Sequence, residues 1–487
     1  MYHPPSKRRQ LIMRIVTYGL MTIAVVGLVS VSLLYILGYR FDEKDRKVEQ
    51  SGLVQYVSTP AGATVKVDGS NLADKTPAKS IMLPGHHEFV MERSGYESWH
   101  KSLDITAGTL TWLNYTRLVP NERPVQTVET LPKLAATLAS PDDKYMAVLP
   151  DATLPAITIY NITGDDVKQS TITLSSEDYT DATTAGITHR FDFVEWDKDG
   201  RYILLTHTYG DKVEWLIVDR QENKLVSNVT RTMDITMSGA RFADTSGTLL
   251  YALVDNTVRK IDISAETVSS PLVSGVSEFH LHDTNVISYV GIPNQSTGHR
   301  EVGVVKDGKK SVAVTTSTTP LTTPLHVVAG RYFGKDYFIV SDGKKVTVWN
   351  GTFPQSSSDA QALQKMTTFT FQDDITSLQL SPEDRFIMVQ HGADFMSYDL
   401  ERKTLSHVAQ MAGTSEPRAL QWLDEYYVWS DRSDALTIRE FDGTNEHTIN
   451  TVAAGFDVTL SENGKYLYSI GKTTSGYQLQ RVRMILS

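Results

Sequence analysis

A short unit that recurs along residues 121–487 constrains the fold of this chain most strongly. Each copy is a tight turn followed at once by an apolar run of strand-forming residues, and another strand-like run often follows. The clearest turns lie at 140–145, 197–202, 381–386 and 461–466, and weaker copies lie at 244–247, 282–285, 334–336 and 423–425. Eight units at a mean period of roughly 46 residues predict a ring of eight four-stranded blades.

The two ends of this repeat region predict how the ring closes. The final run, 477–486, supplies a third strand to the last blade, and the run at 124–130 supplies its outermost strand. Pairing both chain ends in one blade removes the exposed edge that an open sheet would carry. Seven blades are the alternative, if the weak unit around Val286 is an insertion.

The turn-plus-strand string Ser-Pro-Asp-x-Lys-Tyr at 140–145 resembles the turns of WD40-like and TolB-like bacterial β-propellers. The resemblance covers most of residues 130–487. It implies a propeller architecture and no particular activity, because propellers support many unrelated functions.

Residues 15–37 form an uncharged, predominantly apolar run, long enough as a helix to cross roughly 30 Å of hydrocarbon. Tyr18, Tyr35 and Tyr39 lie near its ends, where amphipathic rings favour the membrane interface. A buried core helix is a poor alternative because the run is apolar on every face. A cleaved signal peptide is disfavoured because the run is long and no small-residue cleavage site follows it. The sequence therefore predicts an uncleaved signal anchor.

Basic residues do not decide the orientation of this anchor. Lys7, Arg8, Arg9 and Arg14 precede the run, and four further Lys or Arg follow it within ten residues, interleaved with acidic residues. The compact, acid-free cluster before the run favours a cytoplasmic N-terminus, and we expect the downstream domains to lie outside the cytoplasm.

Between the anchor and the repeats, short alternating runs at 53–57, 64–67, 87–91 and 110–115 predict strands of a small sheet or sandwich. Glycines mark the reversals between them, and Gly69 and Gly85 are predicted at turn or loop positions where a side chain is costly. The string Ser-Thr-Pro-Ala-Gly-Ala-Thr-Val-Lys-Val-Asp-Gly at 58–69 resembles the opening of a PEGA domain. Motifs at 75–77, 83–87 and 93–96 follow in that family's order, although alanine replaces the name-giving glutamate.

This resemblance implies a small surface-associated β-sandwich, often beside a transmembrane segment, and carries over no catalytic residue. The predicted fold class is therefore all-β, with a PEGA-like sandwich, a β-propeller and one N-terminal transmembrane helix. The predicted organisation is a cytoplasmic tail at 1–14, a transmembrane helix at 15–37, a stalk at 38–51, the PEGA-like domain at 52–120 and the propeller at 121–487.

Composition excludes several function classes. The net charge is −10, and residues 1–50 hold eight Lys/Arg and four Asp/Glu, so the remainder carries about −14 and repels phosphate backbones. We therefore expect no nucleic-acid partner. The chain has no cysteine, which excludes disulfides, thiolate metal sites and cysteine nucleophiles.

Histidines and acidic turns offer the few candidates for a chemical site. Neighbours on a strand point to opposite faces, so we expect His86 and His87 to be one solvated and one core-lining residue and not a chelating pair. His280 and His282 share a face, but no third ligand stands at metal-binding spacing. The stretch at 197–200 lacks the spacing and closing glutamate of a calcium loop and is predicted to be a turn.

Other polar and aromatic residues have simpler explanations. The paired carboxylates Glu214 with Asp219, and Asp373 with Asp374, are predicted to be solvated. Five tryptophans on or beside strands are predicted to pack the blades and not to form a sugar-stacking platform: Trp196, Trp215, Trp349, Trp422 and Trp429. No catalytic, cofactor-binding or metal-binding residue is predicted, and no cofactor.

The sequence leads to one function hypothesis and one alternative. The preferred hypothesis is a membrane-anchored binding or scaffold protein of the bacterial cell envelope, not an enzyme, whose propeller contacts an envelope protein or cell-wall polymer. The alternative is an envelope hydrolase or lyase with acid and base residues converging at the propeller channel. Carboxylates and a histidine within hydrogen-bond reach at the channel mouth would favour the enzyme.

Overall fold

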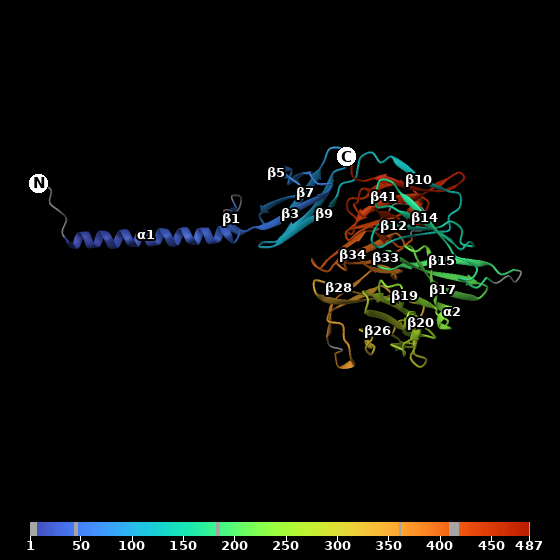
Figure 1. The fold of residues 1–487 in the computed structure, drawn as a ribbon. Helices are drawn as coiled ribbons and strands as arrows, with labels where there is room; N and C mark the ends of the chain where they lie inside the picture. The colour runs from blue at the N-terminus through green and yellow to red at the C-terminus, as the bar shows by residue number, and fades with distance from the viewer. Residues whose placement is uncertain (1–6, 43–46, 182–185, 360–361, 409–417, 487) are drawn as a thin grey trace. The chain divides into compact units, whose positions relative to one another are not determined.

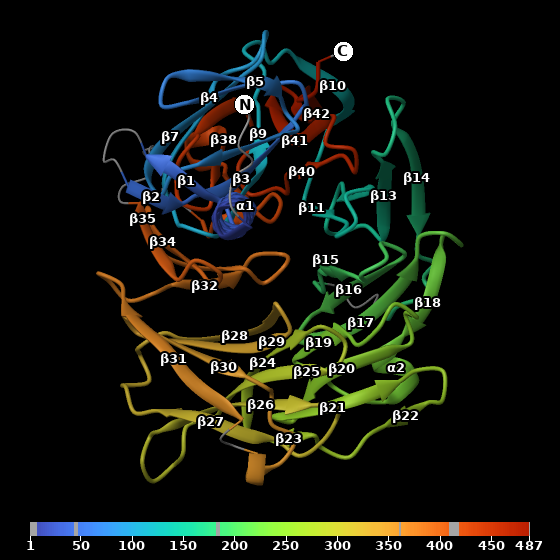
Figure 2. The same cartoon turned by 90° about the vertical axis from the view of Figure 1, so that its left-hand side faces the viewer.

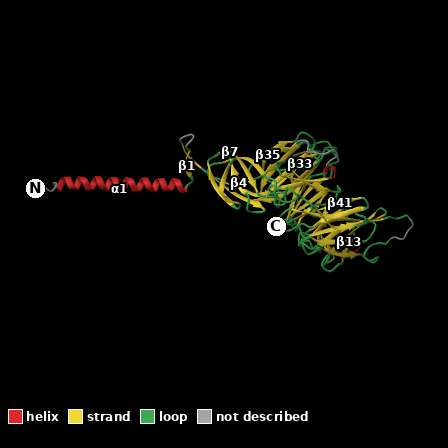
Figure 3. Ribbon diagram, turned by 90° about the horizontal axis from the view of Figure 1, so that it is seen from above, coloured by secondary structure: helices red, strands yellow, loops and turns green. Residues whose placement is uncertain are grey.

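The computed structural model describes residues 7–42, 47–181, 186–359, 362–408 and 418–486. Residues 1–6 of the predicted tail, 43–46 of the predicted stalk and the final residue, Ser487, lie outside this range. Two compact units divide the chain, Met1–Glu122 and Arg123–Ser487. Strands dominate both, and one long helix stands near the N-terminus (Figures 1 and 3).

Helix α1 (Lys7–Ile36) contains almost the whole predicted membrane run, is long and apolar enough to cross a membrane, and buries none of its residues. It begins eight residues before the predicted span, because residues 7–14 are mostly good helix formers. A two-stranded hairpin of β1 (Tyr39–Asp42) and β2 (Lys47–Gln50) follows in the segment predicted as a stalk.

Two sheets packed face to face form the domain after the hairpin. One has the order β6-β3-β9 and the other β5-β4-β7-β8. Their strands are β3 (Gly52–Thr59), β4 (Thr64–Val67), β5 (Ser70–Lys75), β6 (Ala78–Met82), β7 (Gly85–Glu92), β8 (Trp99–Ile105) and β9 (Leu110–Arg117). Tyr56, Phe89 and Trp99 are fully buried between the sheets and supply most of the small core. The predicted sandwich is confirmed.

Turn chemistry in this domain follows the sequence prediction. Gly69 has φ +79° and Gly85 has φ +139°, backbone values that favour glycine. The only difference is that Gly85 is the first residue of β7 and not part of the preceding loop.

The second unit contains eight sheets of four or five strands among the described residues, which confirms eight blades as the preferred count. The ring is seen in Figure 2, with first strands such as β11, β15, β28 and β32 toward the centre. These first strands are β11 (Ala136–Ala139), β15 (His189–Trp196), β19 (Gly239–Phe242), β24 (Val276–His282), β28 (Leu325–Tyr332), β32 (Ser377–Leu380), β36 (Gln421–Trp422) and β40 (Thr459–Leu460). The blade around Val286 is a complete one and not an insertion.

Each first strand pairs with the next strand through a tight turn. The second strands are β12 (Tyr145–Leu149), β16 (Tyr202–Tyr209), β20 (Leu249–Val254), β25 (Val286–Gly291), β29 (Lys335–Asp342), β33 (Phe386–His391), β37 (Tyr427–Ser430) and β41 (Tyr466–Thr473). The third strands are β13 (Ala156–Asn161), β17 (Lys212–Asp219), β21 (Thr257–Asp262), β26 (Arg300–Lys306), β30 (Lys345–Gly351), β34 (Asp394–Asp399), β38 (Ala435–Glu440) and β42 (Gly476–Arg483).

The outer strands complete the blades. They are β14 (Lys168–Thr173), β18 (Lys224–Asn228), β22 (Thr267–Val268) with β23 (Val273–Ser274), β27 (Val312–Ser317), β31 (Leu363–Thr370), β35 (Thr404–Val408), β39 (His447–Thr451) and β10 (Val125–Leu131). Three short helices lie in connections: α2 (Val229–Met233), η1 (Ser357–Asp359) and η2 (Arg432–Asp434).

The chain ends close the ring as predicted. Strand β10 pairs with β42 from Val125 opposite Val482 to Leu131 opposite Tyr477. The last blade therefore has the order β10-β42-β41-β40, with its outermost strand from the start of the unit. Strand β42 is therefore paired on both edges and β10 on one edge.

Apolar side chains fill the spaces between neighbouring blades. One buried cluster joins Leu149 and Ile159 of the first blade to Ile203 and Leu216 of the second, and similar clusters join most later neighbours. A further cluster joins Met146 of the first blade to Tyr468 of the last. The core is thus divided among blade interfaces and depends on ring closure.

The same type of side-chain to backbone hydrogen bond closes the four clearest turns. The side-chain oxygen of the first turn residue accepts the backbone N–H five residues later: Ser140 from Tyr145, Asp197 from Tyr202, Ser381 from Phe386 and Ser461 from Tyr466, at 2.7–3.0 Å. These bonds fix the turn between the first and second strands and set the register of each blade.

Candidate site at the channel mouth

The turns between first and second strands surround one mouth of the central channel, and two adjoining cavities lie there. Their volumes are about 290 and 600 Å³, and both are lined by Lys198, Leu281, His282 and Asp283. We call their combined space the mouth cavity. Five consecutive blades contribute to it, from the blade of β15 to the blade of β32, so the site needs several blades packed side by side.

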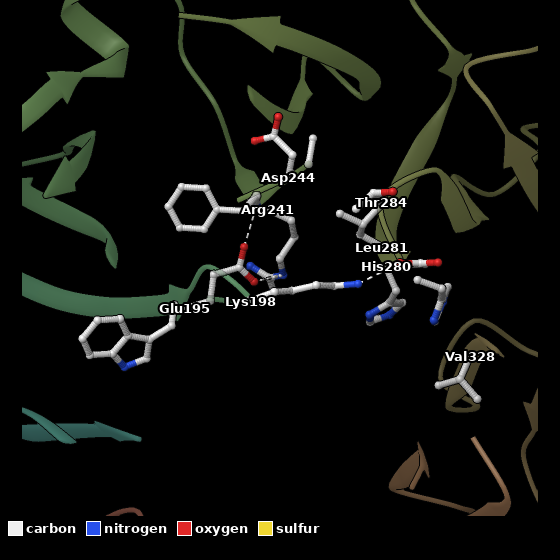
Figure 4. Close-up of a pocket in the computed structure, with 13 residues that line it drawn as sticks. Glu195, Lys198, Arg241, Asp244, His280, Leu281, Thr284 and Val328 are labelled. Carbon is white, nitrogen blue, oxygen red and sulfur yellow. Dashed lines mark hydrogen bonds and ion pairs between the residues drawn. The ribbon is translucent and has the colours of Figure 1, made fainter. Parts of the chain in front are cut away.

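Charged side chains of both signs line the mouth cavity. Lys198 Nζ lies 2.8 Å from Asp283 Oδ1, and Arg241 Nε lies 3.6 Å from Glu195 Oε2. Figure 4 shows the Lys198 side chain extended toward Leu281 of β24 and Thr284 in the turn that follows β24. In the larger cavity, Arg331 Nε is 3.7 Å from Asp336 Oδ1. The Lys198–Asp283 and Arg241–Glu195 pairs are partly exposed, and Arg331 is exposed although its partner Asp336 is buried, so these cations can exchange their partners for a polar ligand at small cost.

His282 is a structural residue of this site. Its Nε2 accepts the N–H of Ala329 in the next blade at 3.1 Å and lies 2.9 Å from Ser288 Oγ. Burial lowers the pKa of His282 to about 3, so the imidazole is neutral. Its Nε2 is occupied by the fold and is not available as a general base.

Four carboxylates bond across blade boundaries in the same way, of which Glu425 is buried and the other three are half-buried. Glu195 accepts the N–H of Phe242 at 2.6 Å, Asp384 that of Arg331 at 2.8 Å, Glu425 that of Glu383 at 2.6 Å and Asp457 that of Ala139 at 3.0 Å. Each bond links a side chain of one blade to the backbone of its neighbour. We call these four carboxylates and His282 the interblade ties.

Desolvation changes the titration of these acids. Burial raises the pKa of Asp384 to about 6, although the Arg331 N–H opposes the shift. Burial raises the pKa of Glu425 to about 7, although bonds from Glu383 and Ser381 oppose it. Perturbed acids often mark active sites, but here each one is explained by its contact with the adjacent blade.

One histidine–carboxylate pair within hydrogen-bond reach lies on β24, and its histidine lines the smaller cavity. His280 Nε2 lies 2.7 Å from Glu278 Oε1, and both side chains are partly exposed. The bond with His280 outweighs burial and lowers the pKa of Glu278, so Glu278 is a charge partner and not a protonated acid. His280 and His282, predicted to share a face, both line the smaller cavity, but they are held by different partners.

The two adjacent histidines of the PEGA-like domain differ in exposure, as the sequence predicts. His86 is exposed beside Asp104, whereas His87 is largely buried, with Nδ1 2.7 Å from Asp68 and Nε2 2.9 Å from the Leu83 carbonyl.

Residues 197–200 form the predicted turn. Among the described residues no group of three or more His, Asp or Glu is arranged to hold a metal ion. Three of the five tryptophans, Trp196, Trp215 and Trp429, are buried, as blade packing requires.

The prediction that Glu214 and Asp219 are solvated is wrong. Asp219 is buried and accepts Arg201 Nη2 at 2.6 Å, and Glu214 is buried against His207. Both lie on β17, a central strand of its blade whose two faces are covered by neighbouring blades. Strand ends are buried in a closed ring, which the linear sequence does not show.

The hydrogen-bond network around Glu214 was not predicted from the sequence either. His189 Nδ1 lies 2.9 Å from His207 Nε2, and His207 Nδ1 lies 3.0 Å from Glu214 Oε2. Thr180 donates to Glu214 through its N–H at 2.9 Å and its hydroxyl at 2.6 Å. Burial opposes these bonds, yet they lower the pKa of Glu214, and burial lowers the pKa of His207. The network attaches the loop before β15 to its blade. The sequence feature that could have predicted a buried polar contact here is His207, a histidine within the apolar run of β16.

Comparison with known family models supports the first predicted module. Residues 52–120 match the family model of the PEGA domain. The resemblance inferred from the motifs at 58–96 is confirmed. No curated protein matches the chain.

Solved structures similar to the chain include several propellers. The Dos1 propeller is 12% identical, with a TM-score of 0.46, 74% of this chain covered and 96% of that one. An oligogalacturonate lyase in complex with manganese is 9% identical, with a TM-score of 0.39 and coverages of 61% and 94%. The dihydro-heme d1 dehydrogenase NirN is 11% identical, with a TM-score of 0.42 and coverages of 65% and 66%. These likenesses concern the fold alone, and the eight sheets of this chain define its propeller.

Proposed function

We propose that this chain is a membrane-anchored binding or scaffold protein of the bacterial cell envelope, with the mouth cavity as its recognition site. The organisation that supports the proposal is an apolar helix, a PEGA domain and a propeller in that order. In this proposal α1 is an uncleaved signal anchor with the N-terminus in the cytoplasm and the bulk of the chain outside. The partner is an envelope protein or a cell-wall polymer.

One observation carries the choice of binding over catalysis. The mouth cavity is large enough for a sugar or peptide segment, yet the histidine most enclosed in it, His282, is neutral and bonded through Nε2 to the adjacent blade. The exposed charges around it, in contrast, form pairs that a ligand can replace. Replaceable polar pairs around a preformed cavity are features of a binding site.

A test of binding uses the full chain in nanodiscs with two ligand preparations, soluble cell-wall polymer fragments and envelope protein extract. We expect saturable binding to one of them. Lys198→Ala and Arg331→Ala should each weaken it about ten-fold, since each removes one charge-assisted hydrogen bond of about 1.5 kcal/mol. Lys224→Ala, which removes an exposed lysine paired with Glu222 on an outer strand, is the matched control. Equal binding by all four proteins would refute the mouth cavity as the recognition site.

The membrane topology has a separate test. Protease added to intact, wall-stripped cells should remove the bulk of the chain. Protection of the C-terminal unit would reverse the proposed orientation, and a mature N-terminus near residue 40 would show that α1 is a cleaved signal sequence.

An envelope hydrolase or lyase is the second candidate, favoured by the Glu278–His280 pair on β24, whose histidine lines the mouth cavity. If it is correct, the purified chain should cleave a cell-wall polymer, and His280→Ala should abolish cleavage while leaving the thermal unfolding midpoint unchanged. Polymer binding without turnover would refute this candidate.

A further inference from the structure

The outer face of the β6-β3-β9 sheet carries an apolar patch that the domain itself does not cover. Ile81, Leu53, Leu110 and Trp112 are 53%, 36%, 43% and 41% exposed, and we call them the outer patch. The alternate residues of these strands, such as Val54, Tyr56 and Leu113, are fully buried in the core. A sheet with one solvated face normally carries polar residues there. This sheet is apolar on both faces at these positions.

Strand register makes the outer patch continuous. Leu53 on the central strand is opposite Ile81 of β6 and Leu110 of β9. Two residues further on, Gln55 is opposite Lys79 and Trp112. Directly opposed residues have Cβ atoms about 5 Å apart, so the first row is an unbroken apolar strip with the indole of Trp112 next to it.

Hydrogen bonds place this strip close to the end of α1. Gln50 Nε2 donates to the Leu37 carbonyl at 3.1 Å, and the Ser51 N–H donates to the Gly38 carbonyl at 2.9 Å. Leu53 follows Ser51 by two residues, which is roughly 7 Å of extended chain. The first row therefore lies within the interfacial depth of roughly 5–8 Å on each side of a bilayer, measured from the end of the span.

Charge on this face agrees with a membrane contact. One row consists of Leu53, Ile81 and Leu110, and the other of Gln55, Lys79 and Trp112. These six outward residues include one lysine and no carboxylate, although the chain carries a net charge of −10. Apolar side chains with a tryptophan and a lysine form the usual composition of a surface that lies at the headgroup boundary.

We propose that the outer patch docks on the membrane surface next to α1. Ile81, Leu53 and Leu110 enter the boundary between headgroups and acyl chains, and Trp112 lies at headgroup level. The PEGA domain is then held by two membrane contacts, the span and the sheet face, and is restrained from turning freely about its short connection. This inference rests on α1 being a retained membrane anchor.

Nitroxide labels provide the test, because the cysteine-free chain accepts single cysteines without background. The full chain is reconstituted in vesicles of zwitterionic and anionic phospholipid with labels at Ile81→Cys, Leu110→Cys and Trp112→Cys. Val25→Cys in α1 is the lipid reference. Asp104→Cys, exposed on the opposite sheet, is the water reference. Collision with oxygen, which concentrates in lipid, is compared with collision with a water-soluble nickel complex.

We expect the oxygen-to-nickel ratio at positions 81 and 110 to be several-fold above that at position 104 and below that at position 25. Position 112 should lie nearer the water value. Water-like ratios at 81 and 110 with a lipid-like ratio at 25 would overturn the docking and leave the anchor intact. A water-like ratio at position 25 would overturn both the docking and the proposed anchor.

Other occupants of the face give distinct signals. Protection from both reagents would show that protein covers the patch, and dipolar broadening that disappears on dilution with unlabelled chain would identify a second copy. Either result overturns the proposal. A charge variant sharpens the test, because Ile81→Asp with Leu110→Asp should move the label at position 112 to the water value. Ser102→Asp, an exposed site on the opposite sheet, should leave that label unchanged.

Discussion

The propeller and the PEGA domain differ in which of their surface groups are bonded or covered by the rest of the fold. In the propeller, polar groups near the channel mouth bond across blade boundaries, and the last blade joins both ends of the unit. The PEGA domain completes its core locally and leaves apolar side chains on one outer face. The interblade ties are explained by the stability of the ring, whereas the exposed charges of the mouth cavity and the uncovered outer patch point to external partners.

The largest expected effect comes from breaking ring closure. Deletion of the final ten residues removes most of β42 with the buried side chains of Leu479, Val482 and Met484 and deprives β10 of its partner. We expect a loss of more than about 5 kcal/mol from burial alone, with aggregation and loss of the cooperative propeller transition. Calorimetry and size-exclusion chromatography measure both, and a truncated protein that stays monomeric and unfolds cooperatively would refute the dependence on closure.

The second-largest expected effect is the difference in unfolding free energy between breaking a buried ion pair of the propeller and breaking an exposed one. Arg385 is buried and bonds Asp399 at 2.8 and 3.2 Å and Glu401 at 2.7 Å. Arg385→Ala leaves Asp399 buried and unpaired and should cost about 3–5 kcal/mol. Lys198→Ala, at the exposed pair with Asp283, should cost less than about 1 kcal/mol. Urea unfolding of both variants checks the contrast, which fails if the two losses are similar.

The interblade ties predict a pH effect confined to the propeller. The pKa of Glu425 is raised to about 7 and that of Asp384 to about 6, so the folded state holds these protons more tightly than the unfolded state. The contribution is fully present below the unfolded pKa near 4 and is lost as pH rises through 6 to 7, on the order of 3 kcal/mol for each group.

Glu425→Gln should flatten this pH dependence, because an amide keeps an acceptor for the Glu383 N–H and does not ionise. Glu222→Gln, at an exposed carboxylate, is the control and should leave the curve unchanged. Unfolding free energies between pH 4 and pH 8 measure the effect. A pH curve of Glu425→Gln that overlies the wild-type curve would remove Glu425 as its cause.

A backbone change tests the PEGA domain on its own. An added side chain at Gly69 meets no neighbouring atom, so only the positive φ opposes it, and Gly69→Val should cost about 1–3 kcal/mol. Gly69→Asn should cost less, because asparagine tolerates that region. Thermal unfolding is the measurement, with the propeller transition expected to stay in place.

The smallest expected effect concerns the outer patch. Trp112→Ser and Leu110→Ser remove side chains that are 41% and 43% exposed and should each lower the unfolding free energy in detergent by about 1 kcal/mol, less than the loss of a fully buried residue. Chemical denaturation checks this, and a loss as large as that of a core residue would mean that the patch belongs to the fold.

Local patterns in the sequence were sufficient for the elements and for their order. The repeated turns at 140–145, 197–202, 381–386 and 461–466 combine with period-2 apolar runs, and both are properties of adjacent residues. The eight blades, the closing pair of β10 with β42, and the positive φ of Gly69 and Gly85 were therefore predictable. The PEGA motifs added the identity of the first domain.

Only the tertiary structure decided which polar groups are buried and what they bond. Glu214 and Asp219 read as strand-end charges, yet ring closure buries them, and Glu425 meets the Glu383 N–H from a blade some forty residues earlier. The outer patch was equally hidden, because Leu53, Ile81 and Leu110 come together only through strand register. Sequence patterns report the environment of neighbours along the chain, whereas burial, pKa and surface continuity depend on segments that are distant along it.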